Sequence, residues 1–446
     1  MKARNHNMLE GSLWDKILFF SLPLAASSIL QQLFNACDSA VVGRFAGSEA
    51  LAAVGANTPV TSLFINALVG LSIGANVVIA QHIGADDTKK ISKTIQTSIL
   101  FSIIGGIVIG IIGILLADPI LSMIGTPANV IGLGSVYLRI YMIGLPFISL
   151  FNFGSAILRS SGDTKRPMYC LIVAGILNIL LNLLLVIVFQ LSVAGVAIAT
   201  VTSNIVSSFL IIYMLCKEQG LIHLDIRHLF IDKPSLIRIL KTGAPASLQS
   251  MVFSFSNICL QSGINSFGSD AIAGSAAASN FEFFDYFMVN AFNQAAVTFI
   301  GQNYAAKKYD RCRQIYKICM IEALIGIISM EMIFFMGRHS LIGLYTTDKN
   351  VASYAIIRMY HCMIPHFLLC SYEITGSIMR GMGNSLLPAL LTVIGSVGFR
   401  LLWLFTVFQH FHTFDMLLNV YPISWILTGT MVITAYFIST KKYFQQ

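Results

Sequence analysis

Residues 31–57 read QQLFNACDSAVVGRFAGSEALAAVGAN, and one part of this stretch occurs twice in the chain. The segment GSEALA at residues 47–52 returns as GSDAIA at residues 268–273, an offset of 221 residues. A repeat of that length predicts two structural halves of similar design. Further positions correspond at the same offset: Gln81 and Gln302, Arg159 and Arg380, Gly162 and Gly383, Asp163 and Asn384, Pro167 and Pro388.

The composition predicts an all-α polytopic membrane protein. The chain has 446 residues, of which 56% are hydrophobic and 11% are charged, whereas soluble domains carry about 25% charged residues. Apolar runs follow one another from end to end, and each is long enough to span a hydrocarbon core of roughly 30 Å. They lack the alternation of polar and apolar residues that is typical of membrane β-strands.

The apolar runs predict twelve transmembrane helices. We expect two six-helix lobes, related by a pseudo-twofold axis along the membrane normal, with a cleft between them. The predicted helices span residues 17–43, 51–83, 93–116, 130–158, 167–189, 193–216, 236–265, 271–303, 314–336, 351–379, 386–408 and 415–438. The corresponding regions are an N-terminal lead at 1–16, in which we expect a surface helix, an N-lobe at 17–216, a linker at 217–235, a C-lobe at 236–438 and a tail at 439–446.

The basic residues predict the orientation of these helices. With the N-terminus in the cytoplasm, 22 of the 28 Lys and Arg residues fall on inner segments, and only Arg44, Arg338 and Lys349 fall on outer ones. Inner loops of membrane proteins carry this excess of positive charge. The net charge of +8 is therefore a topology signal and does not indicate nucleic-acid binding. Both termini and the linker, in which we expect a surface helix, are placed on the cytoplasmic side.

The duplicated core favours a transporter over other classes of membrane protein. Two lobes around a cleft suit alternating access, with the cargo bound between them. The sequence contains no HExxH or GxSxG motif and no pair of aspartates within a span, so we expect no enzymatic activity and no cofactor. Because one chain supplies both lobes, we expect a monomer.

Asp38 is the first candidate for a functional site, because an ionisable group within a span is costly and rare. The helical rise of about 1.5 Å per residue places Asn178, Asn182 and Thr200 in the same membrane layer as Asp38. The two asparagines are four residues apart and share a helix face. These oxygen-bearing side chains suit one proton or one Na⁺. The alternatives are a pair between Asp38 and Arg44, and interhelical hydrogen bonds of the asparagines.

A second candidate site lies in the C-lobe, on the predicted helix 271–303. Glu282 and Asp285 are three residues apart on one face, next to Phe281. Carboxylates attract an organic cation, and aromatic faces add cation–π attraction, so these residues are predicted to line a drug-binding wall. The alternative is an ion pair of one acid with Arg358 or Arg400.

The remaining ionisable groups in the C-lobe divide into two kinds. Glu373 is a further candidate for binding cargo or protons, with an ion pair to Arg380 as the alternative. Glu322 and Glu331 lie on opposite faces of one helix, and we interpret them as structural. His361 and His366 are poorly spaced for a shared metal ion, and we interpret them as packed or hydrated.

Several of these residues belong to stretches that resemble the MATE (multidrug and toxic compound extrusion) transporters, in a branch similar to the bacterial DinF-like proteins. The resemblance covers almost the whole chain. It rests on Pro23, Asp38 with GRFAGSEALAAVG, Tyr137-Leu138-Arg139 with Pro146, LRSSGD at 158–163, NILLN at 178–182, GVAIAT at 195–200, FIGQNYAAKKYDR at 299–311 and MRGMGNS at 379–385.

The resemblance implies a bacterial plasma-membrane exporter that exchanges lipophilic, often cationic, compounds for H⁺ or Na⁺. The family's coupling-ion site carries over to Asp38, Asn178, Asn182 and Thr200, which would be metal ligands only with Na⁺. The chain departs from the family pattern at Asn182, where Asp is frequent, and at Ala305, where Gly is common. It also has no acid in the seventh helix.

The alternative function is a flippase for a lipid-linked sugar or another amphiphile of the same superfamily. A flippase of this kind would need a cationic cleft for the pyrophosphate group. The predicted spans contain more acids than centrally placed bases, which favours a cationic cargo.

Overall fold

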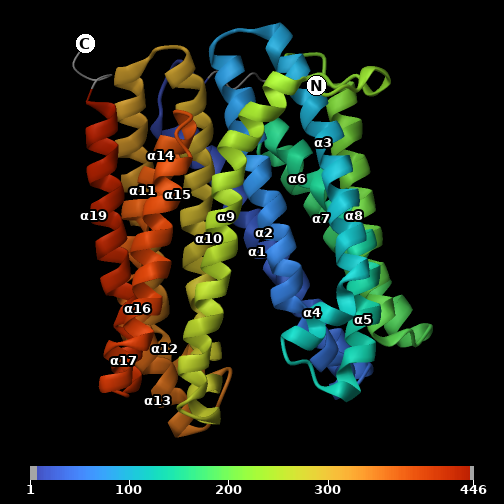
Figure 1. Cartoon of the computed structure of the whole chain (residues 1–446), viewed down its shortest axis with the longest axis vertical. Helices are drawn as coiled ribbons and strands as arrows, with labels where there is room; N and C mark the ends of the chain where they lie inside the picture. Colours follow the sequence, from blue (N-terminus) through green and yellow to red (C-terminus); the bar gives the residue numbers. More distant parts are fainter. Residues whose placement is uncertain (1–7, 442–446) are drawn as a thin grey trace. The chain divides into compact units, whose positions relative to one another are not determined.

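A computed structural model of the chain describes residues 8–441, apart from the side chains of Ser48 and Ala128. Every regular element within the described residues is a helix (Figure 1). An apolar solvent leaves no partner for free backbone N–H and C=O groups, and helices satisfy them within one segment. The predicted lead and tail lie partly outside the described residues.

Two compact units divide the chain, and we describe each by itself. The N-unit comprises Ala26–Ser247, and the C-unit comprises Met8–Ala25 together with the residues from Leu248 onward. These limits differ from the predicted lobes, because α1 (Trp14–Phe45) and α9 (Lys233–Asn265) each contribute to both units. Both changes of unit fall within three residues of a proline inside the helix, Pro23 in α1 and Pro245 in α9.

The N-unit packs its helices closely around α6. Gly106 of α3 has no room for a side chain, because an added Cβ would lie 2.5 Å from Cα of Pro146. Small residues let membrane helices approach in this way. The break between α5 and α6 bends the chain by 46° next to Pro146. The elements are α2 (Ser48–Gly84), α3 (Thr88–Leu115), α4 (Ala117–Met123), α5 (Ala128–Ile143), α6 (Leu145–Ser160), α7 (Lys165–Asn182), the π-helix η1 (Leu183–Val188) and α8 (Ser192–Lys217).

The linker contains one turn of 3₁₀-helix, η2 (Ile226–His228), so the surface helix predicted there is wrong. Ile222 and Leu224 are instead buried against the α3 and α8 side of the N-unit core. The backbone N–H of Leu224 donates to the carbonyl of Leu215 at 3.1 Å. Ile222 and Leu224 are two residues apart and are both buried, although the linker around them is irregular. This spacing of apolar residues is what suggested a surface helix.

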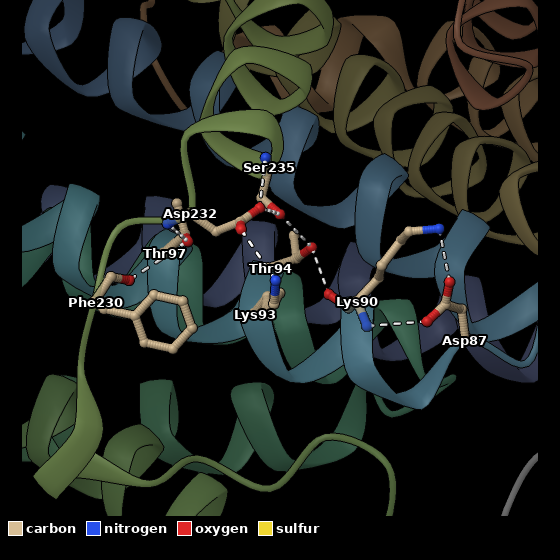
Figure 2. A network of polar contacts seen from close by, with 8 residues as sticks. All are labelled: Asp87, Lys90, Lys93, Thr94, Thr97, Phe230, Asp232 and Ser235. Atoms are coloured by element: carbon tan, nitrogen blue, oxygen red, sulfur yellow. Dashed lines mark hydrogen bonds and ion pairs between the residues drawn. The ribbon is translucent and has the colours of Figure 1, made fainter.

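The end of the linker is fixed to α3 by a polar network (Figure 2). The backbone N–H of Asp232 donates to Oγ1 of Thr97 at 2.9 Å, and Lys93 forms an ion pair with Asp232 at 3.4 Å. Ser235 donates to the Asp232 carboxylate from its hydroxyl at 2.8 Å and from its N–H at 3.1 Å. This is an N-cap for α9. The hydrogen bond from the Ser235 hydroxyl lowers the pKa of Asp232, and the positive charge of Lys93 makes a smaller contribution in the same direction.

The C-unit has more interruptions in its helices than the N-unit has. Its elements are α10 (Ser269–Ala305), α11 (Tyr309–Met336), α12 (Arg338–Gly343), α13 (Lys349–Arg358), the π-helix η3 (Met359–Met363), the 3₁₀-helix η4 (Ile364–Leu368), α14 (Leu369–Gly381), α15 (Leu386–Thr392), the π-helix η5 (Val393–Gly398), α16 (Phe399–Phe405), α17 (Val407–His410), α18 (Phe414–Leu418) and α19 (Val420–Thr440). Pro365 lies in η4, at the point where a single helix from 351 to 379 was predicted.

The described part of the N-terminal lead before α1, residues 8–13, packs on the C-unit and forms no helix. Residues 8–13 are turns and bends. The carbonyl of Met8 accepts hydrogen bonds from the side chains of Asn303 at 3.2 Å and Arg311 at 3.3 Å. These contacts hold the described part of the lead beside the end of α10 and the start of α11.

Among the described residues, fewer than twelve single helices are long and apolar enough to cross a membrane. Within the described residues eight qualify, or nine if the bent pair α5 and α6 counts as one span. The predicted count differs because α9 and α10 carry many polar residues and because α13 to α14 is broken into short pieces. The multi-pass character predicted from composition is confirmed.

Candidate functional site

The structure brings together the four residues that were predicted to hold a coupling ion. Asn182 Nδ2 donates to Asp38 Oδ1 at 2.5 Å and to Asn178 Oδ1 at 3.3 Å. Asn178 Nδ2 donates in turn to Thr200 Oγ1 at 3.4 Å. A chain of hydrogen bonds therefore connects α1, α7 and α8 within the N-unit.

Local packing positions these groups. Asn182 is the last residue of α7, and the π-helix η1 begins at the next residue. Such π-segments are frequent at functional sites because they shift the register of the side chains that follow. One turn before Asn178, Gly175 lies against Phe34 of α1, where an added Cβ would lie 1.8 Å from the ring. This close contact fixes the height of Asp38 relative to the two asparagines.

The negative charge of Asp38 is not balanced by a basic side chain in this cluster, so the cluster can bind a cation. No described basic residue forms an ion pair with Asp38, and the guanidinium of Arg44 lies over Phe45. Asn182 is fully buried, and its carbonyl oxygen Oδ1 has no hydrogen-bond partner. A buried acceptor without a partner needs an explanation in a native structure. The cluster thus combines one carboxylate with an unused amide oxygen.

Two tyrosines near this cluster were not assigned to it in the sequence analysis. Tyr137 and Tyr141 of α5 are buried, and their rings stack 6.0 Å apart. Both lie within electrostatic range of Asp38. Their spacing of four residues places them on one helix face, and that spacing was the available signal.

The acids predicted to line a drug-binding wall have separate partners in the C-unit. Glu282 accepts two hydrogen bonds from Arg358, at 2.7 and 2.8 Å. This is the ion pair considered as the alternative for one of the two acids on α10. Phe281 is buried between the rings of Phe334 and Tyr345. Their predicted role in cargo binding stays a prediction.

Asp285 and Glu373 lie in different surroundings. Asp285 is fully buried beside Glu331 and His366. Glu373 accepts a hydrogen bond from Asn293 at 3.0 Å, two turns further along α10 than Asp285. Arg380 donates to Gln249 at 2.8 Å and forms no ion pair with Glu373 within 4.0 Å. The described contacts therefore divide the predicted cargo residues among several clusters.

Known proteins share both the sequence pattern and the fold of this chain. The MatE family model matches residues 23–184 and again residues 245–406. A probable multidrug resistance protein, YoeA of Bacillus subtilis (strain 168), is 29% identical over 395 residues, which are 87% of this chain and 85% of that protein. The multidrug export protein MepA of Staphylococcus aureus (strain NCTC 8325 / PS 47) is 27% identical over 344 residues, 76% of this chain and 75% of that protein.

Solved structures share the fold over its full length. An outward-facing multidrug resistance MATE transporter of the MOP superfamily superposes with a TM-score of 0.92 at 22% identity, covering 100% of both chains. A MOP superfamily transporter from Pyrococcus furiosus, for which a reversed polarity of the binding pocket suggested a different function, has a TM-score of 0.90 at 23% identity and covers 99% of this chain and 98% of its own.

The two matches of the family model cover most of the chain and recur at nearly the offset of the internal repeat. They coincide with the two halves that the repeated GSEALA segment predicts. The chain is therefore a member of the MATE family of membrane transporters.

Proposed function

We propose that this protein is a secondary active exporter of lipophilic, cationic organic compounds, driven by the exchange of H⁺ or Na⁺ through alternating access. The names of YoeA and MepA support drugs as the cargo class. The observation that carries the proposal is the cluster of Asp38, Asn178, Asn182 and Thr200, which offers a single carboxylate without a basic partner.

The chemistry of the cluster suits ion coupling. A carboxylate in an apolar environment binds a cation in order to avoid an uncompensated buried charge. Carboxylate, amide and hydroxyl oxygens are ligands for Na⁺, and the carboxylate alone can hold a proton. Loading and release of the cation change the charge of the N-unit by one, and this change can bias a transporter between two conformations.

The setting of this exporter follows from the same signals. The concentration of basic residues on alternate loops supports a cytoplasmic position for both termini, and the bacterial origin of YoeA and MepA supports a bacterial plasma membrane. The cargo crosses the plasma membrane outward as the ion moves inward. One chain carries both units, so the monomer is the transporting species.

A flippase for a lipid-linked sugar remains the second candidate, and one observation favours it. Arg400 is buried in the C-unit and forms no ion pair with a described acid; its guanidinium lies over Phe253 at 4.9 Å and Tyr421 at 4.8 Å. A buried cation of this kind attracts a pyrophosphate. The adjacent Arg358 is neutralised by Glu282, so the exporter is the better supported function.

Transport by inverted membrane vesicles tests the proposal. Vesicles containing the native protein are given a fluorescent organic cation with a proton gradient, a sodium gradient or no gradient. We expect accumulation under at least one gradient and none without. The absence of gradient-driven accumulation under both ions, together with translocation of a fluorescent pyrophosphate-linked lipid, would replace the exporter by the flippase.

A further inference from the structure

The C-unit contains a second cluster of ionisable groups, which the proposed function does not use. Asp285 of α10, Glu331 of α11 and His366 of η4 each offer one ligand atom, and these atoms lie within 4.8 Å of one another. His366 Nδ1 and Asp285 Oδ2 are 3.6 Å apart, beyond hydrogen-bonding distance. The three side chains come from three separate helical elements that pack together.

All three side chains are at least nine-tenths buried and have atoms without partners. Asp285 is 0% exposed, and neither of its carboxylate oxygens has a hydrogen-bond partner. The same holds for Oε1 of Glu331 and Nδ1 of His366. Buried polar atoms are normally hydrogen-bonded, and buried charges are paired or coordinate metal ions. Two adjacent acids with free oxygens therefore point to a missing positive ligand.

The donor set indicates which cation this ligand is. An imidazole nitrogen is a poor ligand for Na⁺ or Mg²⁺ but a good one for first-row transition metals, and carboxylates complete such sites. We propose that Asp285, Glu331 and His366 form a binding site for one divalent transition-metal ion of the Zn²⁺ type. Three protein ligands leave a fourth position for water or another ligand.

The distances and charges agree with this assignment. Ligand atoms about 2.0–2.2 Å from one tetrahedral Zn²⁺ ion lie about 3.3–3.6 Å from each other. The three atoms, which lie within 4.8 Å of one another, therefore need only small side-chain rotations to converge. Two carboxylates and one divalent cation are electrically neutral together. Neutrality removes most of the cost of burying charge at this position.

The internal repeat shows that the fold itself does not need these charges. The positions 221 residues earlier hold Phe64, Gly110 and Leu145. Gly110 and Leu145 are also neighbours in the N-unit, because a Cβ added to Gly110 would lie 3.9 Å from that of Leu145. The same packing position is thus apolar in one unit and ionisable in the other, as expected if the C-unit cluster serves a ligand.

The backbone around His366 is specialised as well. A π-helix, η3, is followed directly by the 3₁₀-helix η4, which contains Pro365. These changes of helical pitch place His366 over Trp425, with ring centroids 5.2 Å apart. Trp425 is one of three tryptophans in the chain, so it provides a fluorescent reporter beside the proposed ion.

Direct metal binding tests this inference independently of transport. The full-length protein is purified in detergent with an affinity tag that contains no histidine, equilibrated with ZnCl₂ and desalted. We expect one zinc per chain by elemental analysis and a rise in the unfolding temperature with zinc. Co²⁺ in place of Zn²⁺ should give a visible absorption band and quench Trp425.

Substitutions of the ligands and a matched histidine locate the ion. His366→Leu introduces the residue of the corresponding N-unit position, and Asp285→Asn and Glu331→Gln remove single charges. Each should lower the affinity for zinc by at least about 100-fold, since changes outside the ligand shell already cost 10–100-fold. His361→Gln is the control, because His361 is bound to Asp415 and Asn419 and should be dispensable for binding.

Two results would overturn the assignment. One is a native protein that retains no zinc after desalting and unfolds at the same temperature with and without zinc, in which case the cluster holds only protons. The other is loss of zinc from His361→Gln equal to that from His366→Leu, which would place the metal on the surface. If a ligand variant does not fold, the zinc stoichiometry and thermal shift of the native protein still decide between metal and protons.

Discussion

Phe399 and Trp403 of the C-unit pack ring to ring, 5.8 Å apart, at the repeat positions that Asn178 and Asn182 occupy in the N-unit. Cys259 stands in the place of Asp38, and Tyr421 in the place of Thr200. These four residues of the C-unit all pack against one apolar core cluster. The hydrogen-bonded cluster of the N-unit is therefore not a requirement of the duplicated fold.

The reverse holds for the buried charges of the C-unit. Asp285, Glu331 and His366 correspond to apolar residues or glycine in the N-unit. Each unit thus contains one polar cluster at positions where the other unit is apolar. Burying polar groups costs free energy unless a ligand or partner compensates. This exchange therefore supports both proposals, the ion-coupling site in the N-unit and the metal site in the C-unit.

Among changes to the neighbours of Asp38, the largest effect on transport is expected from removing its hydrogen-bond donor. Asn182→Leu leaves the carboxylate without its 2.5 Å partner. A hydrogen bond to a charged group contributes about 1.5–3 kcal/mol, so gradient-driven transport should fall by roughly 10–100-fold. Uptake by inverted vesicles measures this. Trp403→Leu, at the corresponding C-unit position, is the control and should retain most of the transport; equal losses in both variants would contradict the asymmetry.

Breaking the ion pair in the C-unit should affect stability more than ion coupling. Arg358→Met leaves Glu282 as a largely buried, unpaired charge, which costs about 3–5 kcal/mol. We expect a large fall in the unfolding temperature of the detergent-solubilised protein. The double variant with Glu282→Gln should recover most of this loss. A Glu282→Gln variant that is as stable as the native protein but no longer exports organic cations would assign Glu282 to the cargo instead.

A smaller effect is expected at the contact that positions Asp38. Gly175→Ala forces the ring of Phe34 away from α7, and overpacking of this kind costs about 1–3 kcal/mol. Transport should fall because Asp38 moves with α1. Gly105→Ala is the matched control, since nothing lies within 4 Å of a Cβ added there. Equal transport by the two variants would remove this contact from the account.

The smallest effect, on stability, is expected at the N-terminal ends of α1 and α9, the first helices of the two halves. Asp232 caps α9 through its carboxylate, whereas the lead before α1 is held through backbone carbonyls. The pKa of Asp232 is lowered by Ser235, so its stabilisation is complete above the ordinary aspartate value of about 3.9 and is lost as the pH falls through the folded value.

The pH dependence of unfolding tests this carboxylate. Native protein should be more stable than Asp232→Asn at pH 7, and the difference should shrink only below about pH 4. A difference that stays constant down to pH 3, or grows on acidification, would show that the carboxylate contributes through something other than its charge.

The fold and the N-unit cluster were predictable from sequence for identifiable reasons. The repeated GSEALA segment predicts the two halves, and the distribution of basic residues predicts the orientation of the helices. Neither prediction depends on how the side chains pack. Asp38, Asn178 and Asn182 could be placed in one layer because helical rise alone determines depth. All three also lie on helices that are regular up to the site.

The C-unit cluster was not predictable, because it depends on the packing of three helices and not on spacing within one. Glu331 was interpreted as structural from its position relative to Glu322, and His366 from its distance to His361. Neither of these spacings shows that Glu331 and His366 lie next to Asp285, which is on another helix. The change from η3 to η4 also removes the regular 3.6-residue period on which such predictions rely.

Gradient-driven uptake of a fluorescent organic cation by vesicles containing Asp38→Asn tests the central claim most directly. Asp118→Asn, an exposed aspartate paired with Arg139 at 2.7 Å, is measured beside it. We predict that Asp38→Asn inserts at normal levels but shows no uptake above the level without a gradient, while Asp118→Asn transports like the native protein. Native rates of coupled uptake by Asp38→Asn would contradict the assignment of the ion-coupling site to the N-unit.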